Sequence, residues 1–287
     1  MDLSLKTKRV IYKYTLGVLE CLKIQYMTFC RKSPLLVYQM GKVGSSTVEK
    51  SLKESGVNDP VYHLHFLSAN GIDGALKYYD TLDMGIPVHL QRSMCLRSKL
   101  HEMGKANWRI ITLVREPISR EVSNIYQNLN DTHPELISEL GEFDTSTVSK
   151  IVYDKLNNFN EADDFACNWF DNEFKQALEI DVYTSPFDRD KGYSIIKHNN
   201  VSVLIFRIED MNCNFDKAIN MFIGGDKYVS MKKANIGNSK GYSASYKDTV
   251  KDIKLPRELC EKIYDSKYVR HFYSEEMIEQ FIKKWTS

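Results

Sequence analysis

The stretch "LLVYQMGKVGSSTVEKSL", residues 35–52, joins an apolar run to a helical pattern through a short loop. The apolar run predicts a buried strand, and the loop after it carries glycines, a lysine and three hydroxyl residues. Ser46 and Glu49, three residues apart, predict a capping box at the start of the helix, and Gly56 suits its C-terminal cap. We therefore expect a strand, a glycine-containing turn and a helix in direct succession.

This succession predicts an anion-binding site, because backbone N–H groups and the positive end of the helix dipole converge at the turn. The loop departs from the nucleotide P-loop, G-x-x-x-x-G-K-[ST]: its lysine precedes the second glycine, and no hydroxyl residue follows the lysine directly. An ATPase that holds magnesium through that hydroxyl is disfavoured, and a serine-capped turn without a ligand is the alternative. The residues expected to line the site are Gly41, Lys42, Val43, Gly44, Ser45, Ser46 and Thr47.

A second stretch, "RIITLVREPISREVSNIYQNL" at residues 109–129, repeats the strand-to-helix pattern. Pro117 stands where proline favours the first turn of a helix, and Arg115 stands at the carboxyl end of the strand, where open α/β sheets bind ligands. An arginine fork suits a phosphate group, and the Ser123 hydroxyl can add a hydrogen bond. The alternative is that Arg115 pairs with Glu116 or another acidic neighbour. The apolar face of this helix is expected to comprise Ile118, Val122, Ile125 and Leu129.

The rest of the chain predicts an α/β fold with a parallel sheet covered by helices on both faces, because strand-like runs alternate with helical patterns. Residues 130–178 are expected to be a helical insertion or lid, and helices are expected from about Pro256 onward. The remaining strand-like runs are at 61–66, 86–90, 181–184 and 201–207.

The two loops together resemble the PAPS-dependent sulfotransferases, in particular carbohydrate sulfotransferases and bacterial relatives linked to capsular polysaccharide. "GKVGSST" (41–47) resembles their 5′-phosphosulfate loop, and "VREPISREVS" (114–123) resembles their 3′-phosphate motif. Arg115, Pro117, Arg120 and Ser123 have the spacing of that motif, while Glu116 stands where many members have aspartate. The resemblance covers about 36–128 and continues more loosely through "NWFDNEFK", "VLIFRIEDM" and the C-terminal helices.

The resemblance implies a P-loop-like sulfotransferase fold over 34–287 and transfer of a sulfuryl group from PAPS to a carbohydrate hydroxyl, without a metal. The leaving nucleotide gains negative charge, so Lys42 and the loop amides would stabilise it. Arg115 and Ser123 would hold the 3′-phosphate. Two alternatives remain: a P-loop-like kinase or nucleotide hydrolase, which would need magnesium, and a non-catalytic glycan- or nucleotide-binding protein on the same fold.

Sulfuryl transfer also needs a base for the acceptor hydroxyl, and histidine suits this role because its pKa lies near neutrality. Some related uronyl sulfotransferases carry a histidine on the segment between the two nucleotide motifs, which favours His65 and then His63. His89 is a third candidate, for the base or for acceptor contact, and Arg92 or Arg97 could hold an acidic sugar. The alternatives are hydrogen-bonded core histidines or, less favoured, a metal-binding H-x-H pair.

Two later stretches carry weaker signals. In "MKKANIGNSKGY" (231–242), Lys232 and Asn235 are expected to contact the nucleotide, since related sulfotransferases close a late basic loop over it; a solvated loop is the alternative. In "VLIFRIEDM" (203–211), Arg207 and Glu209 are expected to be structural or nucleotide-adjacent groups.

Composition sets the remaining limits. The 287 residues include 43% hydrophobic and 27% charged residues with a net charge of +1, which fits a globular protein and gives no reason to expect nucleic-acid binding. Six cysteines without a C-x-x-C pair favour reduced thiols and a cytoplasmic location. Residues 1–33 form a basic, partly apolar segment that is expected to pack as a helix on the domain or to contact a membrane surface or a partner.

Overall fold

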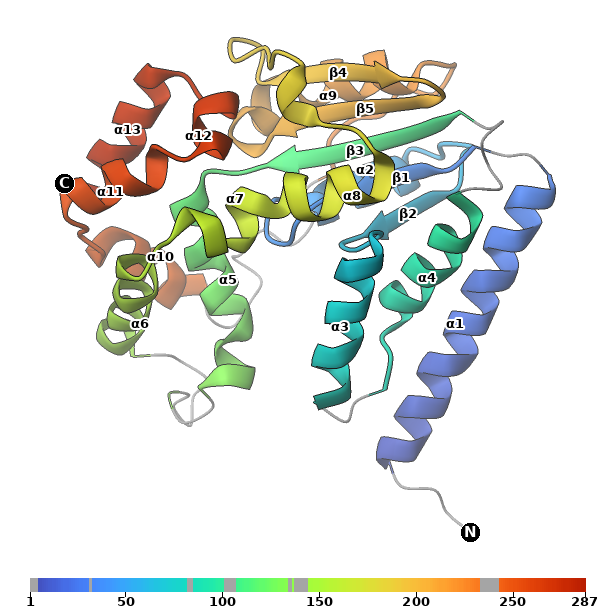
Figure 1. Cartoon of the computed structure of the whole chain (residues 1–287), viewed down its shortest axis with the longest axis horizontal. Coiled ribbons are helices and arrows are strands. Elements are labelled where there is room, and N and C mark those ends of the chain that lie inside the picture. Colours follow the sequence, from blue (N-terminus) through green and yellow to red (C-terminus); the bar gives the residue numbers. More distant parts are fainter. Residues whose placement is uncertain are drawn as a thin grey trace.

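A five-stranded sheet forms the centre of the protein (Figure 1). The computed structural model describes residues 5–30, 33–81, 85–100, 107–133, 136, 144–232 and 243–287. The strands are β1 Leu35–Tyr38, β2 Val61–Leu64, β3 Trp108–Val114, β4 Tyr193–His198 and β5 Val201–Arg207, in the spatial order β2-β1-β3-β5-β4. The strands β2, β1, β3 and β5 pair in parallel with their neighbours, but β4 pairs antiparallel with β5. The fold is α/β as expected, and the sheet is mixed where a parallel one was predicted.

The sequence prediction missed β4, which is an edge strand. Tyr193 is buried, but Lys197 and His198 are exposed, and the strand lacks the long apolar run that marks the central strands. His198 pairs with Val201, so Asn199 and Asn200 alone connect the two strands, and Asn199 has a φ of 51°. Asparagine tolerates this left-handed conformation and is typical of two-residue hairpin turns. The Asn-Asn pair was therefore the signal that could have revealed the hairpin.

Two predicted strands are wrong. Residues 86–90 begin a helix instead, because the Pro87 carbonyl accepts the N–H groups of Leu90 and Gln91 and so starts its first turn. Residues 181–184 form a 3₁₀ turn, in which the Asp181 carboxylate accepts the N–H of Tyr183.

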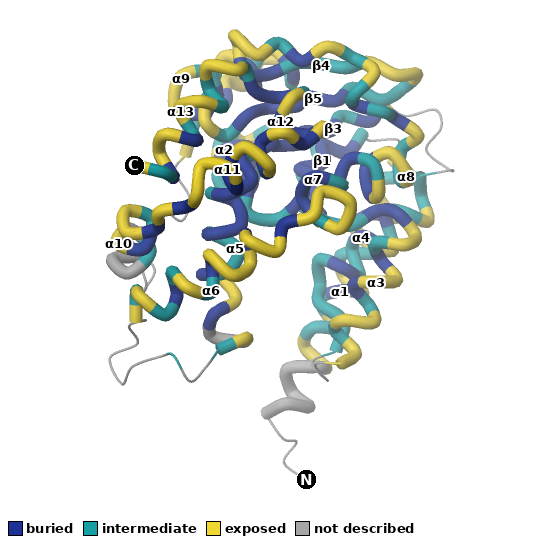
Figure 2. The backbone as a smooth tube through the Cα atoms, turned by 60° about the vertical axis from the view of Figure 1, so that its left-hand side comes forward, coloured by how far each residue is buried: buried dark blue, intermediate teal, exposed yellow. Residues whose placement is uncertain are grey.

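Helices cover both faces of the sheet and enclose its apolar residues, so that β1, β3 and β5 are largely buried (Figure 2). In Figure 1, α1, α3 and α4 lie side by side, and α11, α12 and α13 gather near the carboxyl end of β3. Helices after Pro256 are thus confirmed. The helices are α1 Leu5–Phe29, α2 Ser45–Glu54, α3 Ala69–Thr81, α4 Val88–Leu100, α5 Pro117–Thr132, α6 Thr145–Asn157, α7 Phe165–Trp169, α8 Lys175–Leu178, α9 Met211–Ile223, α10 Ser243–Asp252, α11 Arg257–Tyr264, α12 Lys267–Phe272 and α13 Glu275–Thr286.

The described part of 130–178 is mostly helical, and its second half packs into the core. A π-helical turn, Phe170–Phe174, joins α7 to α8. Within it, the buried Glu173 carboxylate accepts hydrogen bonds from the Tyr38 hydroxyl and, at 2.7 Å, from the Ser68 N–H. The Tyr38 ring also lies 5.1 Å from the Trp169 ring. These contacts tie α7 and α8 to the ends of β1 and β2.

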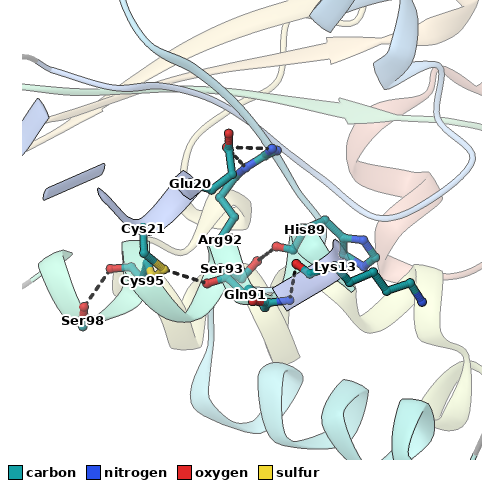
Figure 3. Close-up of a disulfide and its surroundings, with 9 residues drawn as sticks. All are labelled: Lys13, Glu20, Cys21, His89, Gln91, Arg92, Ser93, Cys95 and Ser98. Atoms are coloured by element: carbon teal, nitrogen blue, oxygen red, sulfur yellow. Dashed lines mark hydrogen bonds and ion pairs between the residues drawn. A yellow bond between two sulfur atoms is a disulfide. The ribbon is translucent and has the colours of Figure 1, made fainter. Parts of the chain in front are cut away.

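Helix α1 packs along α4, and a disulfide between Cys21 and Cys95 joins them with a Cα–Cα distance of 5.7 Å (Figure 3). The expectation of reduced thiols is wrong for these two cysteines. Their 74-residue separation hides the pairing from any local spacing rule. Within the described ranges, no helix has the length and apolar character needed to cross a membrane.

Candidate functional site

The order of the strands places the two predicted anion sites next to each other. After β1 the chain moves to β2 on one side, and then crosses over to β3 on the other side of β1. The carboxyl ends of β1 and β3 therefore form a topological switch point, where open α/β sheets bind ligands. The loop 41–47 follows β1, and Arg115 follows β3, so both lie at this point.

The loop has a tightly determined backbone. Lys42 has a φ of 71° and Gly44 a φ of 85°, both in the left-handed region. A Cβ on Gly44 would meet the Ile208 side chain at 2.6 Å, so only glycine fits there. The fully buried Val43 side chain anchors the loop between them. A left-handed lysine costs roughly 1–2 kcal/mol relative to an ordinary conformation, which the surrounding contacts must offset.

The helix after the loop begins two residues earlier than the predicted capping box requires. Gly44 is the N-cap of α2 and supplies no side-chain cap, so the capping box of Ser46 and Glu49 is wrong. Glu49 lies beyond the first turn and instead bonds to Lys53 and His63. Gly56, with a φ of 67°, follows the helix end as predicted. At this end of α2 the Thr47 N–H donates to the Gly44 carbonyl at 3.1 Å, and the positive end of the helix dipole lies at the loop.

Two arginines of the second segment, Arg115 and Arg120, bond to the backbone of the first loop. Arg115 Nη1 donates to the Lys42 carbonyl at 2.9 Å, and Arg120 Nε donates to the Gly41 carbonyl at 3.3 Å. Arg120 is buried and also pairs with Glu121 at 2.8 Å. These bonds hold the loop in its left-handed conformation and bring the two predicted anion sites into one region.

Glu116 does not pair with the Arg115 guanidinium in this structure. Its buried carboxylate caps α5 by accepting the Ser119 N–H, and it accepts hydrogen bonds from the Tyr264 hydroxyl and, at 2.5 Å, from Trp285 Nε1. The Glu116 side chain thus reaches the C-terminal helices, and the Arg115 guanidinium bonds to the loop instead.

One face of α5 extends the site. Lys42 Nζ donates to Gln127 Oε1 at 2.9 Å, and the half-buried Ser123 lies one turn before Gln127 on the same face. One turn earlier still, Ser119 Oγ accepts a hydrogen bond from Lys284 Nζ at 2.8 Å. Desolvation by the surrounding protein lowers the pKa of the Lys284 ammonium. Sequence reasoning missed Lys284 because it belongs to α13, far along the chain.

The three histidines proposed as base candidates converge beside the loop. His63 lies on β2, His65 directly follows β2, and His89 lies in the first turn of α4. The ring centroids of His63 and His65 are 4.9 Å apart, and those of His65 and His89 are 6.2 Å apart. Their sequence positions span two elements, so only the packing of α4 on β2 brings His89 to the other two.

His65 has the geometry of a neutral proton acceptor. Its Nδ1 lies 3.1 Å from the Gln39 carbonyl, which can only accept, so Nδ1 carries the proton and Nε2 carries the lone pair. Desolvation, followed by the proximity of His63, lowers the pKa of His65 to about 4. The ring is therefore neutral at pH 7.

His63 is held from both sides. Its Nδ1 lies 3.0 Å from Glu49 Oε2, and its Nε2 lies 2.9 Å from the side-chain amide of Gln39. The hydrogen bond with His63 is the main cause that lowers the pKa of Glu49 to about 2. Because both ring nitrogens have partners, the geometry favours a positioning role for His63.

Gln39 is a site residue that sequence reasoning missed. It follows β1 directly and is fully buried, with its carbonyl bonded to His65 and its side-chain amide to His63. Its Oε1 is buried and has no hydrogen-bond partner among the described residues. A buried polar residue at the carboxyl end of a central strand was the available signal.

Arg92 and His89 lie about one turn apart on α4, which packs against α1 (Figure 3). Arg92 pairs with Glu20 of α1, with Nε–Oε2 at 3.0 Å, and its guanidinium lies 5.8 Å from the Tyr62 ring centroid. These partners fix the position of the Arg92 guanidinium. Desolvation lowers the pKa of His89, whose ring centroid lies 6.0 Å from that of Tyr79.

The weaker sequence signals have mixed outcomes. Lys232 is exposed, and its N–H donates to Ser51 Oγ of α2 at 2.8 Å, while Asn235 lies outside the described residues. Arg207 is structural: it is buried, pairs with Asp210 and donates to the Phe272 carbonyl at 3.0 Å. Glu209 Oε1 accepts the Glu116 N–H at 2.9 Å, which places its carboxylate beside the start of α5.

Two further observations bear on the chemistry. Among the described side chains, no three His, Cys, Asp or Glu residues are arranged to hold a metal ion. Residues 145–274 match the family NKWYS, described as "putative capsular polysaccharide synthesis protein". The matched range runs from α6 to the end of α12 and excludes both predicted nucleotide loops. No curated protein and no solved structure matches the chain. The family match supports a relation to proteins of capsular polysaccharide synthesis.

Proposed function

We propose that this protein transfers a sulfuryl group from PAPS to a hydroxyl group of a carbohydrate acceptor. The observation that carries the proposal is the meeting of the lysine-bearing loop 41–47 with Arg115 at the switch point of the sheet, next to three histidines. The match to a capsular polysaccharide synthesis family supports a polysaccharide or glycan as the acceptor.

The nucleotide would lie across the two strand ends. Its 5′-phosphosulfate would occupy the loop, where Lys42 and the positive end of the α2 dipole would stabilise the charge that grows on the leaving phosphate. Its 3′-phosphate would lie against Arg115 and Ser123, with the Lys284 ammonium beside them on Ser119. PAPS supplies the activated sulfuryl group, and these side chains bind and orient it.

The acceptor hydroxyl would approach from the histidine side. His65 Nε2 carries the lone pair that would take the hydroxyl proton, and the Nδ1–H bond to the Gln39 carbonyl would stabilise the resulting imidazolium. A pKa of about 4 makes His65 a weak base in the free protein. Anionic groups bound at the loop would raise that pKa towards neutrality, because they favour the protonated ring. Gln39 and His63 would position His65, and His89 and Arg92 would contact the acceptor.

The test is thermal-shift titration of the full chain with PAP, ADP and Mg-ATP. PAP should raise the melting temperature at far lower concentration than ADP, because only PAP carries the 3′-phosphate that Arg115 would recognise. Stronger stabilisation by Mg-ATP would reject the proposal in favour of a kinase or hydrolase. Stabilisation by PAP without any transfer from PAPS to polysaccharide acceptors would assign a non-catalytic binding role.

A further inference from the structure

The outward face of α1 is a large apolar surface. Eight of the fourteen large hydrophobic side chains that are exposed in the described residues belong to this one helix, with exposed fractions from 46% to 86%. They are Ile11, Tyr12, Tyr14, Val18, Leu19, Leu22, Tyr26 and Phe29. At about 100° per residue, all eight fall within less than half of the helix circumference. We call this set the outer face of α1; a contiguous apolar surface of this kind marks an interaction site.

The opposite face fixes the rotation of the helix. Ile24 and Met27 are buried, and a Cβ on the buried Gly17 would meet the Gln91 side chain, so α1 and α4 are in close contact. The Cys21–Cys95 disulfide and the Glu20–Arg92 ion pair, at 2.9 Å, add covalent and charged links (Figure 3). Turning the outer face inward would break all of these contacts, so this face stays directed away from the protein.

The charge of α1 indicates what covers this face. The helix contains five basic residues and one acidic residue, and the acidic residue, Glu20, points to Arg92 on the inner side. The basic residues are Lys6, Lys8, Arg9, Lys13 and Lys23. The helix as a whole is therefore basic, and a surface of anionic lipids would attract it.

The residue types of the outer face fit a lipid surface. Tyr12 and Tyr14 stand near one end and Tyr26 and Phe29 near the other, with the aliphatic Val18, Leu19 and Leu22 between them. An interfacial helix buries such a mixture of aromatic and aliphatic side chains at the boundary between the headgroups and the acyl chains. We propose that the outer face of α1 binds in the plane of a bilayer surface that contains anionic lipids. This proposal does not depend on the proposed catalytic function.

The experiment is co-sedimentation of the full chain with vesicles of phosphatidylcholine alone and of phosphatidylcholine mixed with phosphatidylglycerol. The wild type should sediment with the mixed vesicles, more weakly with the neutral ones, and less in high salt. Leu22→Glu should lower binding to the mixed vesicles by roughly tenfold or more, because it removes a buried apolar contact and adds a repelled charge.

Met221→Glu is the matched control, because Met221 is similarly exposed, at 56% against 54% for Leu22, but lies on α9. It should bind the vesicles like the wild type. Absence of binding to the mixed vesicles would overturn the proposal, and so would equal losses in the two variants. A wild-type dimer in sedimentation velocity that Leu22→Glu dissociates, without vesicle binding, would assign the face to a second copy of the chain.

Discussion

Replacement of Arg115 by alanine should weaken the binding of PAP while leaving most of the turnover at saturating PAPS. In the structure, one guanidinium N–H of Arg115 bonds to the Lys42 carbonyl, which leaves the rest of the fork to a phosphate at the switch point. A hydrogen bond to a charged group contributes about 1.5–3 kcal/mol, so the Kd should rise about 10- to 150-fold. The turnover should fall less, because the 3′-phosphate does not react and Arg120 still bonds to the loop through the Gly41 carbonyl.

Arg115→Lys separates charge from geometry. It keeps the positive charge but cannot hold a phosphate and the Lys42 carbonyl through one planar fork, so its affinity should lie between those of the wild type and Arg115→Ala. Arg109→Ala is the matched control. Arg109 lies at the other end of the same strand, where it pairs with Asp59 and donates to the Ile223 carbonyl at 2.8 Å.

The assay is isothermal titration of PAP into the three variants and the wild type, with single-turnover transfer measured in parallel. Arg109→Ala should lose stability but keep the wild-type Kd for PAP. An unchanged Kd in Arg115→Ala would refute the 3′-phosphate site. An equal loss of affinity in Arg109→Ala would show that the effect comes from general destabilisation of β3.

Four further outcomes are expected. Lys42→Ala should lower the single-turnover rate more than the affinity for PAP, because the lysine meets charge that grows in the transition state. His65→Ala should lower the transfer rate about 10²–10⁴-fold with little change in PAP affinity, and His63→Ala should lower the rate less. A wild-type rate in His65→Ala together with a lower rate in His89→Ala would assign the base to His89. Transfer activity should survive EDTA, whereas loss with rescue by magnesium would favour the kinase alternative. Glu49→Gln should destabilise the protein by about 1–3 kcal/mol at pH 7 in urea denaturation. The difference in unfolding free energy should shrink as the pH falls from 4.5 towards 2. The stabilisation by the Glu49 carboxylate is present above its unfolded pKa and is lost as the carboxylate becomes protonated in the folded state. A difference that does not depend on pH would contradict this origin.

The sequence alone determined the two segments at the switch point. Apolar runs predicted β1 and β3, Pro117 marked the start of α5, and Gly56 marked the end of α2. These features depend on backbone preferences and apolar periodicity within a few residues, which a local pattern contains in full. The local prediction failed at Pro87, where the proline starts a helix, and at Ser46, because Gly44 takes the N-cap position instead.

Only the tertiary structure decided how these segments form one site. The bond from Arg115 to the Lys42 carbonyl, the support of two histidines by Gln39 and the approach of Lys284 to Ser119 all join residues far apart in the chain. The Cys21–Cys95 disulfide belongs to the same class. Each depends on which elements the hydrophobic core packs together, and a single sequence does not contain that information in any local spacing.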